Sequence, residues 1–196
     1  MRTRKREWFD SSSFWRELYP FMFPEKDMAE VDAQMAKALK LAKPPGKTAL
    51  DLCCGAGRYS IALAKRDFSV TGVDKTKYLL DKAREAARAA RVRIEWACQD
   101  MRDFVRPDSF AFVLSMYSSF GYFDDRREDI AVLENIFASL QPGGVLLIDL
   151  MNKERLASIN SHTTPTRLQD GSRHVERRKI FGDRIRFRNE RFVARN

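Results

Sequence analysis

Three acidic residues are the first candidates for chemistry in this sequence of 196 residues. Asp51 lies in a short apolar run, Asp74 ends the next run 23 residues later, and Asp100 follows a third. If these runs are neighbouring parallel strands, their ends meet at one edge of the sheet, where open α/β sheets bind ligands. A carboxylate accepts hydrogen bonds from vicinal hydroxyls or from an amino group. The spacing therefore predicts a ligand with such donors, with Asp74 at the roughly 20-residue distance of a ribose-binding acid.

A glycine-rich turn joins the first run to a segment with helical periodicity. Gly55 and Gly57 let the chain reverse sharply and let a ligand lie on the main chain, while the following helix directs N–H groups at that ligand. The dinucleotide fingerprint requires a third glycine where this chain has Ser60. We therefore expect the turn to bind an anionic group other than a pyrophosphate. The alternative is an ordinary strand-to-helix turn without a ligand.

Three sequence patterns resemble a known family. D-x-x-x-G-x-G at residues 51–57 resembles the first motif of the class I S-adenosylmethionine (SAM) methyltransferases, whose ligand offers a methionine carboxylate. S-S-F-G-Y-F at 118–123 and L-Q-P-G-G-V-L-L-I-D-L-M-N at 140–152 look like the glycine N-methyltransferase group and its bacterial small-molecule N-methyltransferase relatives. The motifs span about half the chain. The resemblance implies a transferase that uses SAM, releases S-adenosylhomocysteine (SAH) and methylates a small-molecule acceptor.

The resemblance also implies a set of cofactor-binding residues. Asp51, Gly55 and Gly57 would hold the methionine moiety and Asp74 the ribose. Asp100 and Met101 would bind the adenine. The others implied at the site are Lys75, which follows the ribose acid, and Met116 and Tyr117, which would border the sulfonium.

Two departures from the family pattern concern the acceptor. Glycine N-methyltransferases have Asn where this chain has Ser118, and a substrate-binding arginine where it has Met151. Glycine is therefore not the expected substrate, and Arg58 or Arg155 are the candidate replacements for that arginine. Methyl transfer from a sulfonium requires no metal. No catalytic base is assigned, and the candidate proton acceptors are Tyr117, Tyr122, Asp124 and His162.

The elements predicted around these residues form a Rossmann-like, doubly wound α/β sheet. An N-terminal helical cap starts with a helix that follows the serines at 11–13 and ends at Pro20 and Pro24. The remaining expected helices cover about 27–41, 77–90 and 124–140, besides the one after Gly57. The expected strands are 48–52, 69–73, 93–97, 110–115 and 145–150.

Two late segments are expected in the core. The helix that ends at Leu140 is predicted to turn one apolar face inward, made of Ile130, Leu133, Ile136, Phe137 and Leu140. The run at 145–150 is continuously apolar, which is typical of a strand buried on both faces.

The last 46 residues depart from a complete class I sheet. We predict a short helix at 153–160, a polar loop at 161–171 and a hairpin of 174–181 with 184–193. The hairpin is expected to be an exposed antiparallel arm, which would leave the fifth strand an open edge without its closing strands. A partner subunit would cover that edge, or the chain is a shortened form of a longer protein, which we favour; the rival is that the hairpin supplies the closing strands. The expected domains are 1–45, 46–152 and 153–196.

Composition and charge limit the remaining classes of function. A hydrophobic content of 44% suits a globular protein, and neither a secretory leader nor a membrane span is expected. The three cysteines, Cys53, Cys54 and Cys98, favour a reducing cytoplasm without structural zinc. The chain ends supply +4 and +6 of the net charge of +9. Two alternatives stay open: a nucleic-acid methyltransferase that uses the basic arm, and an inactive SAM-binding or interaction protein.

Overall fold

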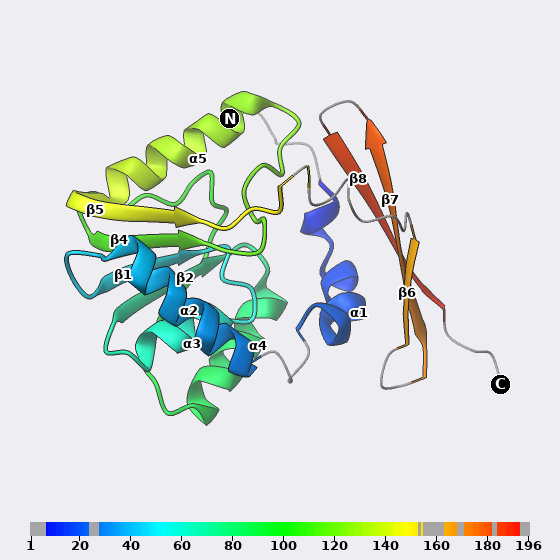
Figure 1. Cartoon of the computed structure of the whole chain (residues 1–196), viewed down its shortest axis with the longest axis horizontal. Helices are drawn as coiled ribbons and strands as arrows, with labels where there is room; N and C mark the ends of the chain where they lie inside the picture. Colours follow the sequence, from blue (N-terminus) through cyan, green and yellow to red (C-terminus); the bar gives the residue numbers. More distant parts are fainter. Residues whose placement is uncertain are drawn as a thin grey trace. The chain divides into compact units, whose positions relative to one another are not determined.

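Alternating strands and helices build a parallel five-stranded sheet in the computed structural model, with the strand order β3-β2-β1-β4-β5 (Figure 1). This is the doubly wound order of a class I methyltransferase fold, as predicted. The strands are β1 Thr48–Leu52, β2 Ser69–Asp74, β3 Glu95–Cys98, β4 Phe110–Ser115 and β5 Leu140–Ile148. The structure describes residues 7–23, 28–152, 154, 163–167, 171–181 and 184–192.

Helices connect these strands and precede the first of them. They are the 3-10 helix η1 Trp8–Asp10, α1 Ser12–Met22, α2 Met28–Ala42, α3 Arg58–Ala64, α4 Lys77–Ala89 and α5 Arg126–Ser139. Ser11 caps α1 as expected, because its hydroxyl accepts the Phe14 N–H at 3.3 Å. The prediction that Pro20 ends this helix is wrong: Pro20 lies in the last turn, where its missing N–H removes a single hydrogen bond. None of the described helices is long and apolar enough to cross a membrane.

The apolar core has two parts, one on each face of the five-stranded sheet. Phe112 and Leu114 of β4 pack with α2 and α3, whereas Val113 between them packs toward α5 on the opposite face. This alternation follows from the period of two along a strand. The same sheet therefore holds α2 and α3 on one face and α5 on the other (Figure 1).

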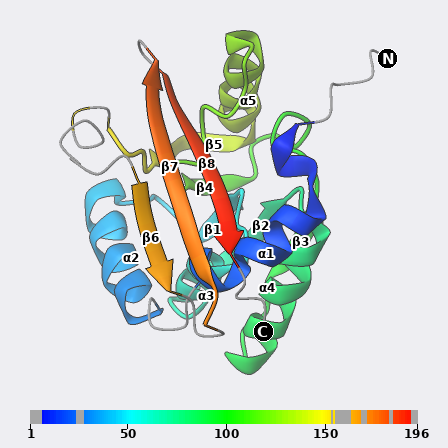
Figure 2. The same cartoon turned by 90° about the vertical axis from the view of Figure 1, so that its right-hand side faces the viewer.

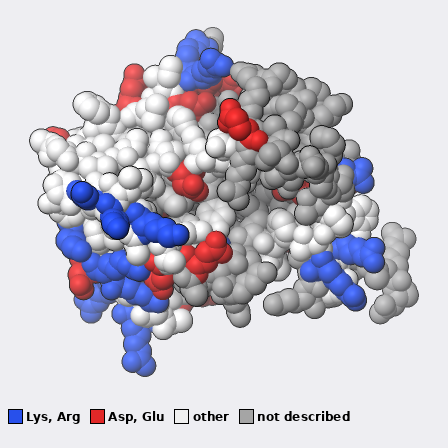
Figure 3. Space-filling model, viewed as in Figure 1, with Lys and Arg blue, Asp and Glu red and all other residues white. Residues whose placement is uncertain are grey.

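The side of α5 that faces the sheet agrees with the prediction only in part: Ile136 and Leu140 pack in the core as expected. Val132 and Ile136 are buried, whereas Ile130, Leu133 and Phe137 are 53%, 39% and 81% exposed. The helix is apolar on two sides, so periodicity alone could not identify the side that the sheet covers. In Figure 3, the surface over β5 and the second half of α5 is largely free of charged residues.

The fifth strand is the edge of the sheet. It pairs in parallel with β4, from Phe112 with Val145 to Ser115 with Ile148, and the described residues place no strand on its other side. The predicted open edge is confirmed. The expectation that this strand is buried on both faces is wrong, since Val145 to Ile148 are only partly buried. An edge position explains this, because neighbouring strands cover a central strand and not an edge strand.

The C-terminal strands form a separate antiparallel sheet, with the order β6-β7-β8 (Figure 2). They are β6 Thr163–Arg167, β7 Arg173–Phe181 and β8 Arg184–Phe192. The predicted hairpin arm is confirmed, and the rival reading, in which it closes the main sheet, is wrong. The polar loop predicted at 161–171 is wrong where β6 pairs with β7. Nearly all of the helix predicted at 153–160 lies outside the described residues.

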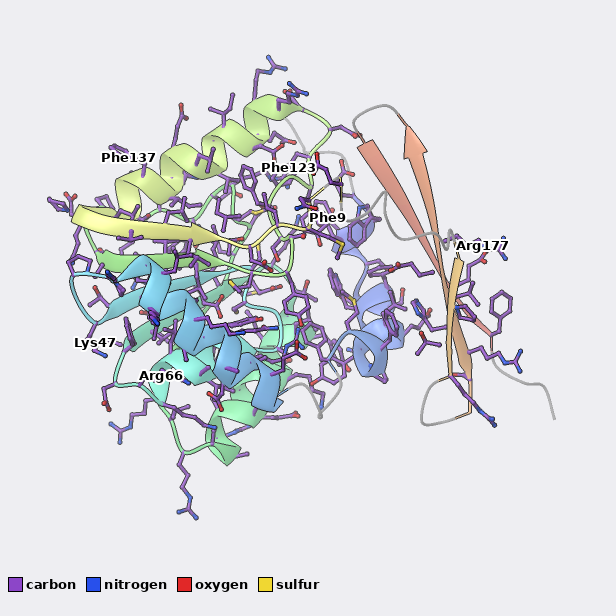
Figure 4. The ribbon with its side chains drawn as sticks, viewed as in Figure 1. Phe9, Lys47, Arg66, Phe123, Phe137 and Arg177 are labelled. Carbon is purple, nitrogen blue, oxygen red and sulfur yellow. The ribbon has the colours of Figure 1, made fainter. Side chains whose placement is uncertain are left out.

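The chain divides into two compact units. The first contains Met1–Trp15 and Glu25–Leu150, and the second contains Arg16–Pro24 and Met151–Asn196. Within the second unit, Phe21 of α1 packs on the buried His174 of β7, with ring centroids 3.9 Å apart. Arg177, labelled in Figure 4, lies 3.5 Å from Glu190 across the hairpin.

Candidate functional site

The three predicted acids lie at one edge of the sheet, at or just after the ends of adjacent strands. Asp51 of β1 is level with Gly72 of β2, and Asp74 is level with Cys98 at the end of β3. Asp100 follows two residues later. All three belong to the first compact unit. Parallel strands bring residues from distant parts of the sequence together here, as the spacing predicted.

Asp51 is buried and is held by a residue outside the predicted set. The Ser60 hydroxyl donates to its Oδ2 at 2.5 Å, and the two side chains are 2% and 0% exposed. Burial raises the pKa of Asp51 to about 7, and the charge of Asp74 adds to the rise, although the bonds from Ser60 oppose it. The serine that breaks the dinucleotide fingerprint is therefore the hydrogen-bond donor that fixes this carboxylate.

The glycine turn has two left-handed glycines with different neighbours. Gly57 has φ +77°, and a Cβ there would lie 2.7 Å from Trp96 and 2.9 Å from Ala83. Gly55 has φ +54°, and its N–H donates to Asp74 Oδ2 at 2.8 Å. The turn thus joins the end of β1 to the end of β2, and Gly57 is required by close packing as well as by its backbone conformation.

Asp74 is aimed into the site by main-chain donors. Its Oδ1 accepts the Thr76 N–H at 2.7 Å, and its Oδ2 accepts the Gly55 N–H. Burial raises the pKa of Asp74, although these two bonds and a third from the Thr76 side chain favour the charged form. A carboxylate has four lone pairs, so the three donors leave one of them for a ligand hydroxyl.

Asp100 is the centre of an ion-pair network. The main-chain N–H and the Nε–H of Arg102 donate to Asp100 Oδ1. Arg102 Nη2 lies 2.7 Å from Oδ2, and Lys75 Nζ lies 3.0 Å from the same oxygen. Burial alone would raise the pKa of Asp100, but these donors outweigh it and lower the pKa below its ordinary value. With two donors on each oxygen, an adenine amino group must replace one of them. The adenine role of Asp100 stays a prediction.

The same network ties the N-terminal segment to this end of the site. Lys75 also contacts Asp10 of η1, and its ammonium lies 5.2 Å from the centre of the Phe9 ring. Phe9 in turn packs on Phe123 with ring centroids 6.1 Å apart, and Figure 4 labels both rings. The expected cofactor residue Lys75 therefore also anchors residues more than sixty positions earlier in the chain.

Met101 lies largely in the core beneath these groups. It is 8% exposed, and its sulfur accepts from the Cys53 thiol at 3.4 Å. Burial raises the pKa of the Cys53 thiol well above its usual range, so this cysteine is a packing residue and not a thiolate nucleophile. A ligand at the site would meet the exposed part of Met101, and its adenine role stays a prediction.

The end of β4 supplies the other side of the site. Tyr117 is 51% exposed, and the guanidinium carbon of Arg58 lies 4.8 Å from the centre of its ring. Arg58 directly follows Gly57 and contributes to the electrostatic environment of Asp51. Of the two arginines considered for the acceptor, Arg58 is thus beside the predicted site, and Arg155 lies outside the described residues.

Tyr122 is one of the candidate proton acceptors from the sequence. Burial raises the pKa of its hydroxyl to about 12, and the charges of Cys53 and Asp74 add to the rise. Its ring also packs on the rings of Trp8 and Phe9 of η1, with centroid distances of 5.4 and 5.7 Å. The candidate base His162 lies outside the described residues.

Comparisons with known proteins agree with this geometry. A family model for a methyltransferase domain matches residues 49–144. The chain is 30% identical over 132 residues to the "Putative methyltransferase YqeM" of Bacillus subtilis, and the aligned region covers 67% of this chain and 53% of that protein. It is 31% identical over 108 residues to the ubiquinone biosynthesis O-methyltransferase of Coxiella burnetii, and the aligned region covers 55% of this chain and 45% of that protein.

A solved structure shares the fold across nearly all of the chain. SAM-bound CalS10, an amino pentose methyltransferase from Micromonospora echinaspora, superposes with a TM-score of 0.63 and 22% identity. The match covers 97% of this chain and 83% of that one. The chain spans about half the length of the curated relatives it matches. Together, the family model and the shared strand order show that residues 49–144 match a methyltransferase domain and that the chain has the class I methyltransferase fold.

Proposed function

We propose that this chain binds SAM along the edge formed by the ends of β1 to β4 and transfers its methyl group to a small-molecule acceptor. The geometry of Asp74 is the observation that carries the proposal. The main-chain N–H groups of Gly55 and Thr76 and the Thr76 side chain fix this carboxylate, and one lone pair remains for a ribose hydroxyl. A second lone pair becomes free when the Thr76 hydroxyl turns to another acceptor, and Asp74 then fits the vicinal diol of an adenosyl group.

The other predicted residues fit the two ends of the same ligand. Asp100 and Met101, at the end of β3, lie on one side of Asp74, and the glycine turn after β1 lies on the other. We infer that the adenine lies at the β3 end and the methionine portion lies between Asp51 and Tyr117. This orientation puts the ammonium of the ligand near a carboxylate and its carboxylate near Arg58.

The bound SAM would supply an electrophilic methyl group on a sulfonium. The residues of the chain then have to align the acceptor with the sulfur–methyl bond and exclude water. Tyr117 and Tyr122 come from the segment after β4, which borders both the glycine turn and η1. We assign alignment and exclusion of water to this segment, and we assign no proton acceptor.

The names of the relatives support a class of acceptor. One acts as an O-methyltransferase in ubiquinone biosynthesis, and a solved relative in fold methylates an amino pentose. The first name specifies methylation of an oxygen, and the second specifies an amino sugar as the acceptor. We propose an acceptor of this kind, with the exposed rings of Trp8, Tyr117 and Tyr122 as its surroundings.

Calorimetric titration of the chain with SAM and with SAH tests the proposal. We expect both to bind, and we expect Asp74→Ala to weaken SAM about 100-fold, because two hydrogen bonds to a charged group are lost. Asp81→Ala is the matched control, since Asp81 is an acid on α4 that pairs with surface cations. It should bind SAM like the wild type.

Two results would change the conclusion. A folded wild-type chain that binds neither ligand would refute the proposal. Binding of SAM without transfer to any ring-bearing amine or phenol would favour the alternative of an inactive SAM-binding protein.

A further inference from the structure

Two consecutive residues after β4 adopt a backbone conformation that side chains normally avoid. Tyr117 has φ +57° and Ser118 has φ +54°, both in the left-handed region. This conformation costs free energy for any residue with a Cβ, and it persists only where surrounding contacts impose it. Neither position is glycine, so the contacts that hold this turn need an explanation.

Asp149, the residue after β5, supplies those contacts. Its carboxylate Oδ2 accepts the Tyr117 N–H at 3.1 Å, and its main-chain oxygen accepts the Ser118 N–H at 2.9 Å. Its own N–H donates to Ser115 O at 2.9 Å, which extends the ladder between β4 and β5 by one residue. One residue therefore holds both strained positions, and only the bond to Tyr117 uses its side chain.

The turn lies beside the glycine motif. In the parallel register of β1 and β4, Asp51 is level with Leu114, so Tyr117 is three residues beyond that level. The centre of the Tyr117 ring lies 4.8 Å from the guanidinium carbon of Arg58 and 6.1 Å from the centre of the Tyr59 ring. Arg58 and Tyr59 are the first two residues after Gly57. A displacement of the turn would therefore move the Tyr117 ring relative to the end of β1.

We propose that Asp149 is a positioning residue for methyl transfer, which holds the Tyr117–Ser118 turn against the sulfonium end of the cofactor. This inference rests on the proposed function. Asp149 is exposed, so its carboxylate is not needed to fill the core. Its hydrogen bond fixes the turn, and its negative charge lies on the side of the site assigned to the positive sulfur. The first effect needs an acceptor oxygen at this position, and the second needs the charge.

Three variants separate these effects. Asp149→Ala removes the acceptor and the charge but keeps both main-chain bonds, whereas Asp149→Asn keeps an oxygen that can accept the Tyr117 N–H. Glu134→Ala on α5 is the control for removal of an exposed negative charge. Each variant is titrated calorimetrically with SAM and with SAH, which differ only in the methyl group and the charge on sulfur, and its unfolding temperature is measured.

A positioning role predicts unequal effects on the two ligands. We expect Asp149→Ala to raise the dissociation constant of SAM about tenfold and that of SAH about threefold, through loss of one hydrogen bond and one charge. Asp149→Asn should restore SAH binding but leave SAM binding about threefold weaker than in the wild type, because the charge is still missing. Equal weakening of both ligands, unchanged binding of both, or an Asn variant as weak as the Ala variant would each overturn the proposal.

A measurement without ligand makes the test independent of cofactor binding. Amide hydrogen exchange at Tyr117 should become at least about tenfold faster in Asp149→Ala, because its only bond partner in the described structure is the lost carboxylate. Adding Ser118→Gly should restore part of the SAM affinity of the Ala variant, since glycine adopts a positive φ without strain. Unchanged exchange, or no rescue by glycine, would contradict the positioning role.

The two proposals fail in different ways. If the wild-type chain binds neither SAM nor SAH, the proposed function fails and the role of Asp149 in methyl transfer fails with it. If the wild type binds both and the Asp149 variants keep its ratio of dissociation constants, only the positioning role is refuted.

Discussion

The two halves of the proposed ligand-binding edge are built in opposite ways. At the ends of β2 and β3, Asp100 is 10% exposed and receives four donors from Arg102 and Lys75. At the ends of β4 and β5, Asp149 is exposed and its carboxylate receives one main-chain donor. In the first half, ion pairs fix the carboxylate of Asp100. In the second half, a turn with two positive φ angles is held by one hydrogen bond to a side chain and by main-chain bonds.

This difference matches the tasks proposed for the two halves. An invariant group such as adenosine is best bound by side chains that are already fixed, because fixed donors and acceptors lose little entropy on binding. An acceptor must reach the methyl group and leave again, so the half that meets it has to stay open. The comparison teaches that ion pairs with little exposure fix the first half, whereas one main-chain donor to an exposed carboxylate holds the second.

Removal of the buried arginine should have the largest effect. Arg102→Leu leaves Asp100 without its main partner, and the Arg102 side chain is only 4% exposed. We expect the free energy of unfolding to fall by about 3 kcal/mol, the usual cost of breaking a buried ion pair. Urea unfolding followed by circular dichroism measures this loss.

The matched control is Arg127→Leu. Arg127 forms a similar short pair with Asp125, two positions away in sequence, but its side chain is 88% exposed. Exposed pairs contribute little to stability because water screens them. No measurable change is expected, and equal losses in the two variants would remove the basis of the comparison.

The next effect concerns the pH dependence of stability at Asp51. Burial raises its pKa to about 7 in the folded chain, above the ordinary value of 3.8. The folded state therefore binds a proton more tightly than the unfolded state, so stability falls as the pH rises from about 4 to 7. Asp51→Asn removes this penalty and should gain about 2 kcal/mol relative to wild type between pH 5 and pH 8.

Unfolding of the ligand-free chain at the two pH values measures this gain. Asp67→Asn, a change at an exposed acid on the opposite end of β2, should keep the wild-type slope. An Asp51→Asn variant with an unchanged slope would show that Asp51 is ionised in the folded state at pH 5.

The smallest effect is expected for the tie between η1 and the β2 end. Asp10→Asn removes the ion pair with Lys75, whose side chain is 36% exposed. The stability should fall by less than about 1 kcal/mol, because the pair is partly hydrated. Amide hydrogen exchange should detect this change more sensitively than global unfolding does. The amides of residues 8–15 should exchange several-fold faster, while the exchange rates of the β1 amides stay unchanged.

Sequence patterns predicted the elements with short-range signals well. The apolar runs located β1, β2 and β4 within one residue, and the serines at 11–13, of which Ser11 is the cap, were recognised as the start of α1. These features depend on periodicity and on contacts within a few residues. The patterns failed where a choice between two faces was needed, as for Phe137 on α5. They also failed for β6, which forms because β7 lies beside it.

The candidate site divides in the same way. The positions of Asp51, Asp74 and Asp100 at strand ends, and the glycines between β1 and α3, were readable from the sequence alone, because strand and turn signals are local. Their partners were not. Ser60 lies nine positions from Asp51, and Arg102 lies twenty-six positions from Glu128, its second carboxylate.

The sequence by itself determined the alternation of strands and helices, the family resemblance and the three acids at the strand ends. Only the tertiary structure decided that Ser60 fixes Asp51, that Lys75 joins Asp10 to Asp100 and that Asp149 holds the turn at Tyr117. The physical reason is that hydrogen bonds and ion pairs between distant residues arise from the packing of whole elements, which no local pattern of residue types encodes.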